Sequence, residues 1–277
     1  MIRLNAMPMD FAPRNKILPR LPDNLKPEMS EFESAFLCGA LKTFRPKKIV
    51  EVGVASGGTT AIILQTLEDI GAPYEMHSID LSPNLWSNPN YPTGFLATFA
   101  KENVFGTLNG THTFHLGTIL PQVIDEIGGV DFVILDTTHM LPGELLDFIA
   151  VLPYLTDEAL VVLHDVSLHQ FTNCEKADAT GILFGAVTAE KFLNFQPDEC
   201  VFRYPNIAAL RVNKQTAANI ENVFLSLILR WDYFPDEQIK IYRQLYRRFY
   251  SDALCEIFQE AVDMNGLHIW AAQQNRG

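Results

Sequence analysis

Residues 49–60 read Ile-Val-Glu-Val-Gly-Val-Ala-Ser-Gly-Gly-Thr-Thr, and this stretch decides the fold of the chain. An apolar run ends at an acid, Glu51, and a glycine-rich turn follows over 53–58. A helical pattern of apolar residues then begins at Ala61. A strand, a tight glycine turn and a helix N-terminus together let a nucleotide-like ligand approach the backbone. The stretch therefore predicts a ligand site at the end of the first strand of an α/β sheet.

The spacing of the glycines separates the classes of nucleotide site. Gly53 and Gly57 do not fit the dinucleotide fingerprint G-x-G-x-x-G, and no Gly-Lys-Ser/Thr is present to hold phosphates. A carboxylate beside a looser glycine turn suits a ribose and a cationic tail better than a pyrophosphate. The stretch resembles the first motif of class I S-adenosylmethionine-dependent methyltransferases. The resemblance implies S-adenosylmethionine as the cofactor.

Strands and helices alternate along most of the chain. Segments 130–136 and 159–164 are continuously apolar, which is typical of parallel strands covered on both faces. Repeated β-α units predict a doubly wound sheet, and segments 200–204 and 207–213 predict an antiparallel hairpin at its end. The resemblance likewise implies a seven-stranded, mostly parallel, Rossmann-like sheet. The other expected strands cover 48–53, 74–80 and 111–116, and the expected helices cover 58–69, 93–105, 118–126, 143–154 and 181–193.

The chain divides into three predicted parts. Residues 1–29 are rich in Pro, Asn and Met, which predicts an irregular N-terminal arm. A methyltransferase domain over 30–214 begins with a capping box made by Ser30 and Glu33. Residues 215–277 predict a C-terminal helical extension, whose basic and aromatic residues indicate a packing face, a homodimer contact or a cap over the substrate. The helices expected there cover 217–231, 236–250 and 252–264.

The composition limits the partners and the compartment. A net charge of −12 disfavours nucleic acid as a partner. The four cysteines form no C-x-x-C motif and are expected to be reduced thiols. The N-terminus lacks the apolar core of a signal peptide, and no apolar run is long enough to span a membrane. We therefore expect a cytoplasmic protein that binds neither nucleic acid nor membrane.

The strand ends predict the cofactor contacts, because ligands of open parallel sheets bind there. The resemblance implies that Glu51 faces the amino group of the methionine moiety. Asp80 is placed to accept both ribose hydroxyls, although Asp-Leu-Ser-Pro also fits a turn. Where the family often has Gly-Asp-Ala beside the adenine, this chain has Gly117-Thr118, so Thr118 holds the adenine amine less strongly or only caps a helix. The expected cofactor contacts are Glu51, Gly53, Val54, Ala55, Ser56, Gly57, Thr59, Asp80, Leu81, Gly117, Thr118 and Asp136.

Two acids and two histidines end the fourth and fifth strands, as Asp136 and His139, then His164 and Asp165. Adjacent parallel strands would bring these ends together. The pattern resembles a branch of class I enzymes that includes macrolide-sugar O-methyltransferases and cephalosporin-hydroxylase-like proteins. In that branch the corresponding acids hold Mg²⁺ and the histidine of Asp-x-x-His is the general base. The resemblance therefore implies Asp136 and Asp165 as metal ligands and His139 as the base.

His164 departs from the magnesium enzymes, which carry an acid there. Because Mg²⁺ prefers oxygen, an imidazole favours a softer ion such as Mn²⁺ or Zn²⁺, or no metal at all. In the second case His164 orients a neighbour or shuttles a proton. The expected ligand set for a divalent Mg, Mn or Zn ion is Asp136, His164 and Asp165.

The chemistry requires such groups, because a hydroxyl attacks the sulfonium methyl only once its proton is removed. The leading prediction is methyl transfer from S-adenosylmethionine to a small-molecule hydroxyl on a sugar, a polyketide or a phenol. One alternative is a protein that binds S-adenosylmethionine without turnover. Another is a nicotinamide-dependent oxidoreductase, which the missing G-x-G-x-x-G disfavours.

Overall fold

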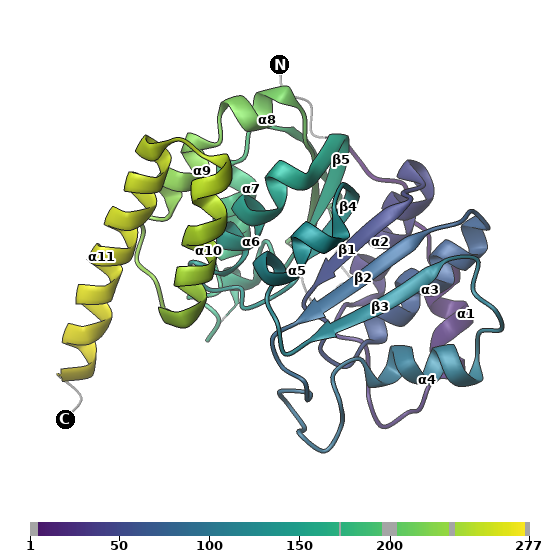
Figure 1. The fold of residues 1–277 in the computed structure, drawn as a ribbon. Coiled ribbons are helices and arrows are strands. Elements are labelled where there is room, and N and C mark those ends of the chain that lie inside the picture. Colours follow the sequence, from purple (N-terminus) through teal and green to yellow (C-terminus); the bar gives the residue numbers. More distant parts are fainter. Residues whose placement is uncertain (1–4, 172, 196–203, 233–235, 275–277) are drawn as a thin grey trace.

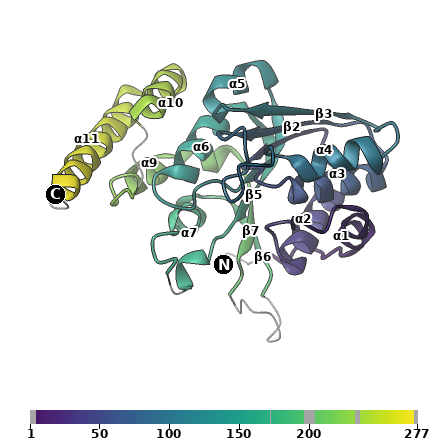
Figure 2. The ribbon, with the colours of Figure 1, turned by 90° about the horizontal axis from the view of Figure 1, so that it is seen from below.

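A central sheet organises the chain in the computed structural model, which describes residues 5–171, 173–195, 204–232 and 236–274. Within these residues seven strands form one sheet in the order β3-β2-β1-β4-β5-β7-β6. Figure 1 labels β1 to β5 of this sheet, and Figure 2 labels β7 and β6. All neighbours are parallel except β7, which is antiparallel to both β5 and β6. The predicted fold class is confirmed. The strands are β1 Lys48–Val52, β2 Glu75–Asp80, β3 Thr111–Leu116, β4 Val130–Leu135, β5 Leu155–His164, β6 Glu190–Leu193 and β7 Ile207–Arg211.

Helices cover both faces of the sheet (Figure 2). Val50, Val133 and Val161 pack toward one face, and their sequence neighbours Ile49 and Ile134 pack toward the other. This alternation explains the continuous apolar runs, since both faces of each strand are buried. The first face shares one hydrophobic core with α5 Leu120–Ile127, α6 Gly143–Val151, α7 Ala179–Ala186 and α9 Glu221–Ser226. Two more helices extend this core: α10 Asp236–Phe249 packs on α5 and α6, and α11 Asp252–Gln274 packs on α9 and α10. The other face carries α1 Ala12–Ile17, α2 Glu31–Phe44, α3 Gly58–Ile70 and α4 Phe95–Asn103.

Local sequence signals set two features beside the sheet. The Ser30 hydroxyl accepts from the backbone N–H of Glu33, and the Glu33 carboxylate accepts from Ser30, so the predicted capping box at the start of α2 is confirmed. Gly53 after β1 has a φ of 96°. A Cβ on Gly53 would lie 1.7 Å from the carbonyl oxygen of Asp136, so only glycine lets the ends of β1 and β4 approach this closely.

The sheet edge beyond β5 differs from the prediction. The expected strand 200–204 lies almost wholly outside the described residues. β7 pairs instead with β6, which falls inside the expected helix 181–193, so that helix assignment is wrong beyond Ala186. Glu190-Lys191-Phe192-Leu193 has no strand alternation of its own, and its pairing with β7 decides its conformation.

Two terminal expectations also need correction. The arm over 1–29 is not wholly irregular, because it contains α1 and the short 3-10 helix Leu18–Arg20. The single helix expected at 217–231 is instead two short helices, α8 Lys214–Ala218 and α9. Other short 3-10 helices cover Leu152–Tyr154 and Leu168–Gln170.

The C-terminal helix α10 packs directly on α6. The hydroxyls of Tyr242, Tyr246 and Tyr250 hydrogen-bond to Asp147, the Leu146 carbonyl and the Ile149 carbonyl. Because these tyrosines are four residues apart, they lie on one side of α10, with Tyr250 directly after its last residue, Phe249. The predicted packing face is confirmed, and the homodimer contact stays a prediction. Among the described residues, no helix is long and apolar enough to cross a membrane.

Candidate functional site

The ends of β4 and β5 bring the predicted acids and histidines together. Asp136 follows β4, and His164 with Asp165 closes β5. Nδ1 of His164 lies 3.0 Å from Oδ1 of Asp136 and 3.3 Å from Oδ2 of Asp165. Since β4 and β5 are parallel neighbours, the sheet itself fixes this convergence.

His139 approaches the same two carboxylates from the loop after β4. Its Nε2 lies 3.2 Å from Oδ2 of Asp165 and 3.8 Å from Oδ1 of Asp136. Its Nδ1 lies 3.3 Å from the buried Glu144 carboxylate. Glu144, in the first turn of α6, also accepts hydrogen bonds from the backbone N–H groups of Thr137 and His139. The His139 φ is 60°, a left-handed conformation that these contacts hold in place.

Glu33 and Asn206 complete the cluster from distant parts of the chain. Nδ2 of Asn206 donates to Oδ1 of Asp165 at 2.6 Å and to Oε1 of Glu33 at 2.8 Å. Oε2 of Glu33 lies 3.5 Å from Nε2 of His164. Glu33 is only 3% exposed. Its carboxylate accepts from the backbone of Ser30 in the helix cap and from Asn206 in this cluster, so it has two roles. The capping-box signal accounted for Glu33 in the sequence and gave no indication of this second role.

The charges of the cluster reinforce one another. Burial opposes protonation of His139, but Glu144, Asp136 and Asp165 outweigh it and raise the pKa of His139 to about 9. Burial likewise opposes protonation of His164, and the charges of Asp136 and Asp165 raise its pKa well above the usual range. Burial favours a neutral Asp165, but the charge of His164 lowers the pKa of Asp165 to about 2. Burial also favours a neutral Glu33, and the adjacent His164 lowers the pKa of Glu33 to about 2.

The donor groups fit a divalent cation. Two overlapping sets, Glu33 with His164 and Asp165, and Asp136 with His139 and Asp165, each place their ligand atoms within 4.8 Å of one another. Nε2 of His164 is buried and has no hydrogen-bond partner among the described residues. Carboxylates outnumber imidazoles in the cluster, and mixed oxygen and nitrogen donors suit Mn²⁺ or Zn²⁺ as well as Mg²⁺.

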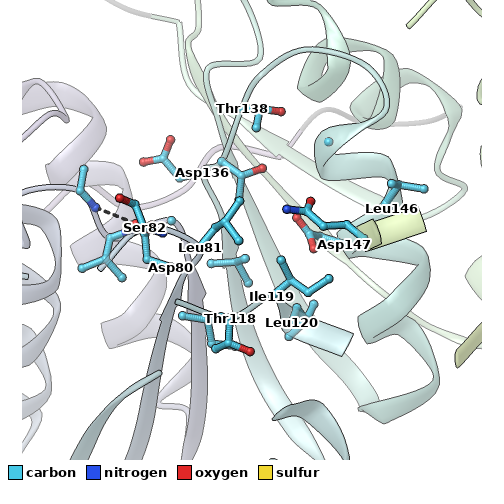
Figure 3. Close-up of a pocket in the computed structure, with 18 of the residues that line it drawn as sticks. Asp80, Leu81, Ser82, Thr118, Ile119, Leu120, Asp136, Thr138, Leu146 and Asp147 are labelled. Carbon is cyan, nitrogen blue, oxygen red and sulfur yellow. Dashed lines mark hydrogen bonds between the residues drawn. The ribbon is translucent and has the colours of Figure 1, made fainter. Parts of the chain in front are cut away.

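A cavity of about 250 Å³ lies beside this cluster, and Asp136 belongs to both (Figure 3). It lies between the ends of β1, β2 and β4 and the helices α5, α6 and α10. The expected cofactor contacts that line it are Gly53, Val54, Ala55, Asp80, Leu81, Thr118 and Asp136. Those that do not line it are Glu51, Ser56, Gly57, Thr59 and Gly117.

Glu51 lies in the core below the glycine turn. Its Oε2 accepts hydrogen bonds from the hydroxyls of Ser78 at 2.6 Å and Thr60 at 2.8 Å. Burial raises the pKa of Glu51 to about 8, although these two hydrogen bonds oppose the shift. The hydroxyl of Ser56 also turns away from the cavity, because it donates to the Glu28 carboxylate.

Asp80 has a structural role in a turn, which was the alternative to ribose binding in the sequence analysis. Its Oδ2 accepts from the backbone N–H groups of Val54 and Ala55, and its Oδ1 accepts from that of Ser82. The carboxylate thus fixes the glycine turn while it lines the cavity. A contact with ribose stays a prediction.

Four further cavity residues are not among the expected cofactor contacts. Trp86 comes from the loop after β2, and Asp147 comes from α6. Gln238 and Tyr242 come from α10, which is remote in sequence from the sheet. Their contribution depends on how the C-terminal helices pack, and no local pattern encodes that packing.

Residues 50–166 match a family model described as a methyltransferase domain. No curated protein matches the sequence. Among solved structures, the chain is similar to an O-methyltransferase from Bacillus cereus in complex with SAH. The match has 13% identity and a TM-score of 0.47, and it covers 73% of this chain and 92% of that one. It is also similar to the O-methyltransferase TomG from Streptomyces achromogenes, which is described as involved in tomaymycin synthesis and in complex with SAM. That match has 17% identity and a TM-score of 0.48, and it covers 74% of this chain and 91% of TomG. The segment matched by the family model begins in β1 and ends after β5, so it contains the glycine turn and both strand ends of the acidic cluster.

Proposed function

We propose that this chain transfers the methyl group of S-adenosylmethionine to a hydroxyl oxygen of a small molecule, and the match of residues 50–166 to a methyltransferase domain supports this. A sugar, polyketide or phenol hydroxyl is the proposed acceptor. The observation that carries the proposal is the position of Asp136, which lines the cavity and also contacts the two histidines of the cluster. Donor and acceptor sites therefore meet at one residue.

The cavity has the chemistry that S-adenosylmethionine requires. Asp80 supplies a carboxylate at the end of β2, where a ribose would lie. Apolar side chains of Leu81, Ile119 and Leu146 line the cavity and can pack on the faces of a purine. The bound cofactor supplies an electrophilic methyl group on its sulfonium, and the chain has to orient that methyl toward the acceptor.

His139 is the proposed general base. Its Nε2 is directed at Asp165 and Asp136, and its side chain is 21% exposed, so an acceptor oxygen can reach it. The proton moves from the acceptor hydroxyl to Nε2, while Glu144 holds the Nδ1 side of the ring. The surrounding carboxylates raise the pKa of His139 to about 9 and so keep it protonated at neutral pH, and it can accept the proton only where a higher pH or a bound cation leaves it neutral.

Asp136, His164 and Asp165 are the proposed ligands of a divalent ion. Asn206 and Glu33 hydrogen-bond to one another and support Asp165 and His164 from behind. Such a second layer of hydrogen bonds orients metal ligands. When bound, a divalent cation would supply positive charge that lowers the pKa of the acceptor hydroxyl and of His139.

The test uses the full chain with S-adenosylmethionine and a panel of sugars, polyketides and phenols, with and without divalent metal. Mass spectrometry of the methylated product, together with S-adenosylhomocysteine formation, measures turnover. We expect transfer to at least one hydroxyl class. Binding of S-adenosylhomocysteine in calorimetry without any turnover would instead favour the non-catalytic alternative. Failure to bind it would overturn the proposal altogether.

A further inference from the structure

The end of β3 has no carboxylate that could accept a hydrogen bond from the adenine amine. Gly117-Thr118 stands at this position, and neither residue has a carboxylate. The Thr118 hydroxyl donates to Oε1 of Gln122 at 3.0 Å, and its oxygen can offer an amine only the acceptor strength of a neutral hydroxyl. A carboxylate acceptor for the 6-amino group of an adenine ring would therefore have to come from another element that lines this cavity.

Asp147 of α6 places a carboxylate in the wall of the cavity instead. It is 5% exposed and lies beside the apolar residues Leu146, Ile119 and Leu120. In Figure 3, Asp147 and Asp80 lie on opposite sides of the cavity, with Leu81 and Ile119 between them. A nucleoside whose ribose contacts Asp80 would extend its base over Leu81 and Ile119 toward Asp147.

The hydrogen bonding of Asp147 is incomplete. Its Oδ1 accepts from the Tyr242 hydroxyl at 2.6 Å, and its Oδ2 accepts no hydrogen bond from any described residue. Burial raises the pKa of Asp147 to about 7, and the hydrogen bond from Tyr242 only partly opposes this. Burying a carboxyl group is costly unless its oxygens accept hydrogen bonds, so a donor on a molecule in the cavity would stabilise Asp147 through Oδ2.

We propose that Asp147 determines the specificity of the cofactor cavity by accepting a hydrogen bond from the 6-amino group of adenine. The inference rests on the proposed function, since it takes the cofactor to be S-adenosylmethionine. Tyr242 orients the carboxyl group, and α6 brings this acceptor to the cavity in place of the strand end. Asp147 contacts the cofactor in this proposal and takes no part in the chemistry.

The experiment compares two ligands that differ only at the adenine amine. Calorimetry on the full chain measures the Kd of S-adenosylhomocysteine and of its analogue with hydrogen in place of the 6-amino group. We expect wild type to prefer S-adenosylhomocysteine by about 10- to 100-fold, the range for a hydrogen bond to a charged group. In Asp147→Ala the two ligands should bind equally, because only the aminated ligand loses a contact.

Tyr242→Phe is the matched control, since it removes the same hydrogen bond between α6 and α10 but leaves the carboxylate. It should retain most of the preference, which a purely structural role of Asp147 does not predict. If Asp147→Ala does not fold, Asp147→Asn takes its place and should lose most of the preference, because a neutral amide oxygen is the weaker acceptor. Equal binding of both ligands by wild type, or an unchanged preference in the Asp147 variant, overturns the inference. Failure of wild type to bind S-adenosylhomocysteine overturns the proposed function instead.

Discussion

Nδ1 of His164 lies 3.0 Å from Oδ1 of Asp136, and this contact joins the ends of two neighbouring strands where the cavity meets the acidic cluster. His164, the residue that replaces an acid of the magnesium enzymes, therefore lies at the centre of the cluster. Whether His164 binds a metal or orients Asp136, it acts on the residue shared by both halves of the site.

Replacing Asp165 should weaken divalent metal binding. Asp165→Asn removes one negative charge and one ligand oxygen, and we expect Mn²⁺ affinity to fall by about tenfold or more. Calorimetry with Mn²⁺ measures the change. Asp157→Asn is the control, because Asp157 lies on the same strand but is exposed at its opposite end. Equal Mn²⁺ affinity in the two variants would argue against the metal assignment.

Replacing His139 should separate chemistry from cofactor binding. His139→Ala is expected to lower the rate of methyl transfer by about 10²- to 10⁴-fold, the contribution typical of a general base. The Kd of S-adenosylhomocysteine should not change, since His139 does not line the cavity. His115→Ala, on the edge strand β3, should keep the wild-type rate. A His139 variant with full activity would rule out its role as base.

Glu51 should make folding stability depend on pH. Its pKa rises from the ordinary 4.5 to about 8 in the folded chain, because the carboxyl is fully buried. Between these two values the unfolded state has lost the proton and the folded state keeps it, so stability falls as pH rises. The slope is about 1.4 kcal/mol per pH unit for this group.

Glu51→Gln should remove that contribution while its amide oxygen still accepts from Ser78 and Thr60. Urea unfolding at pH 5 and at pH 8 measures the difference between wild type and variant. The variant should lose less stability between the two pH values. A parallel decline in both proteins would show that Glu51 is ionised in the folded state.

Gly53 should be more sensitive to substitution than other glycines of positive φ. Gly53→Ala places a methyl group 1.7 Å from the Asp136 carbonyl oxygen, so the ends of β1 and β4 must separate. Gly71→Ala has a similar φ of 71° but meets nothing within 4 Å, and should cost only about 1 kcal/mol. Thermal unfolding and S-adenosylhomocysteine binding compare the two variants. A similar loss of stability in both would mean that the backbone relaxes around Gly53.

Local patterns predicted the parallel part of the sheet well. The buried strands β4 and β5 have continuous apolar runs, and each strand from β1 to β5 is followed by a helix, so neighbouring residues determine the assignment. β6 has no such pattern, and its conformation depends on pairing with β7. Prediction therefore failed where a short edge strand takes its structure from a partner rather than from its own sequence.

The acids and histidines of the cluster could be predicted for the same reason, since they end successive strands. Glu33 could not, because it reaches Asn206 across a separation of 173 residues. The role of Asp147 could not be predicted either. It is an acid within the apolar helix α6, and its contacts depend on the position of α10. Contacts between distant segments supplied what the motifs lacked.

The helix α6 connects the acidic cluster with the cavity. Glu144 in the first turn of α6 holds the loop of His139, and Asp147 one turn later faces the cavity. Because a helix moves as a rigid rod over so short a distance, any tilt of α6 displaces both carboxylates together. The tyrosines of α10 brace that rod against α6 from outside the sheet. By holding α6 in place, the C-terminal helices therefore fix the position of His139 relative to the cavity.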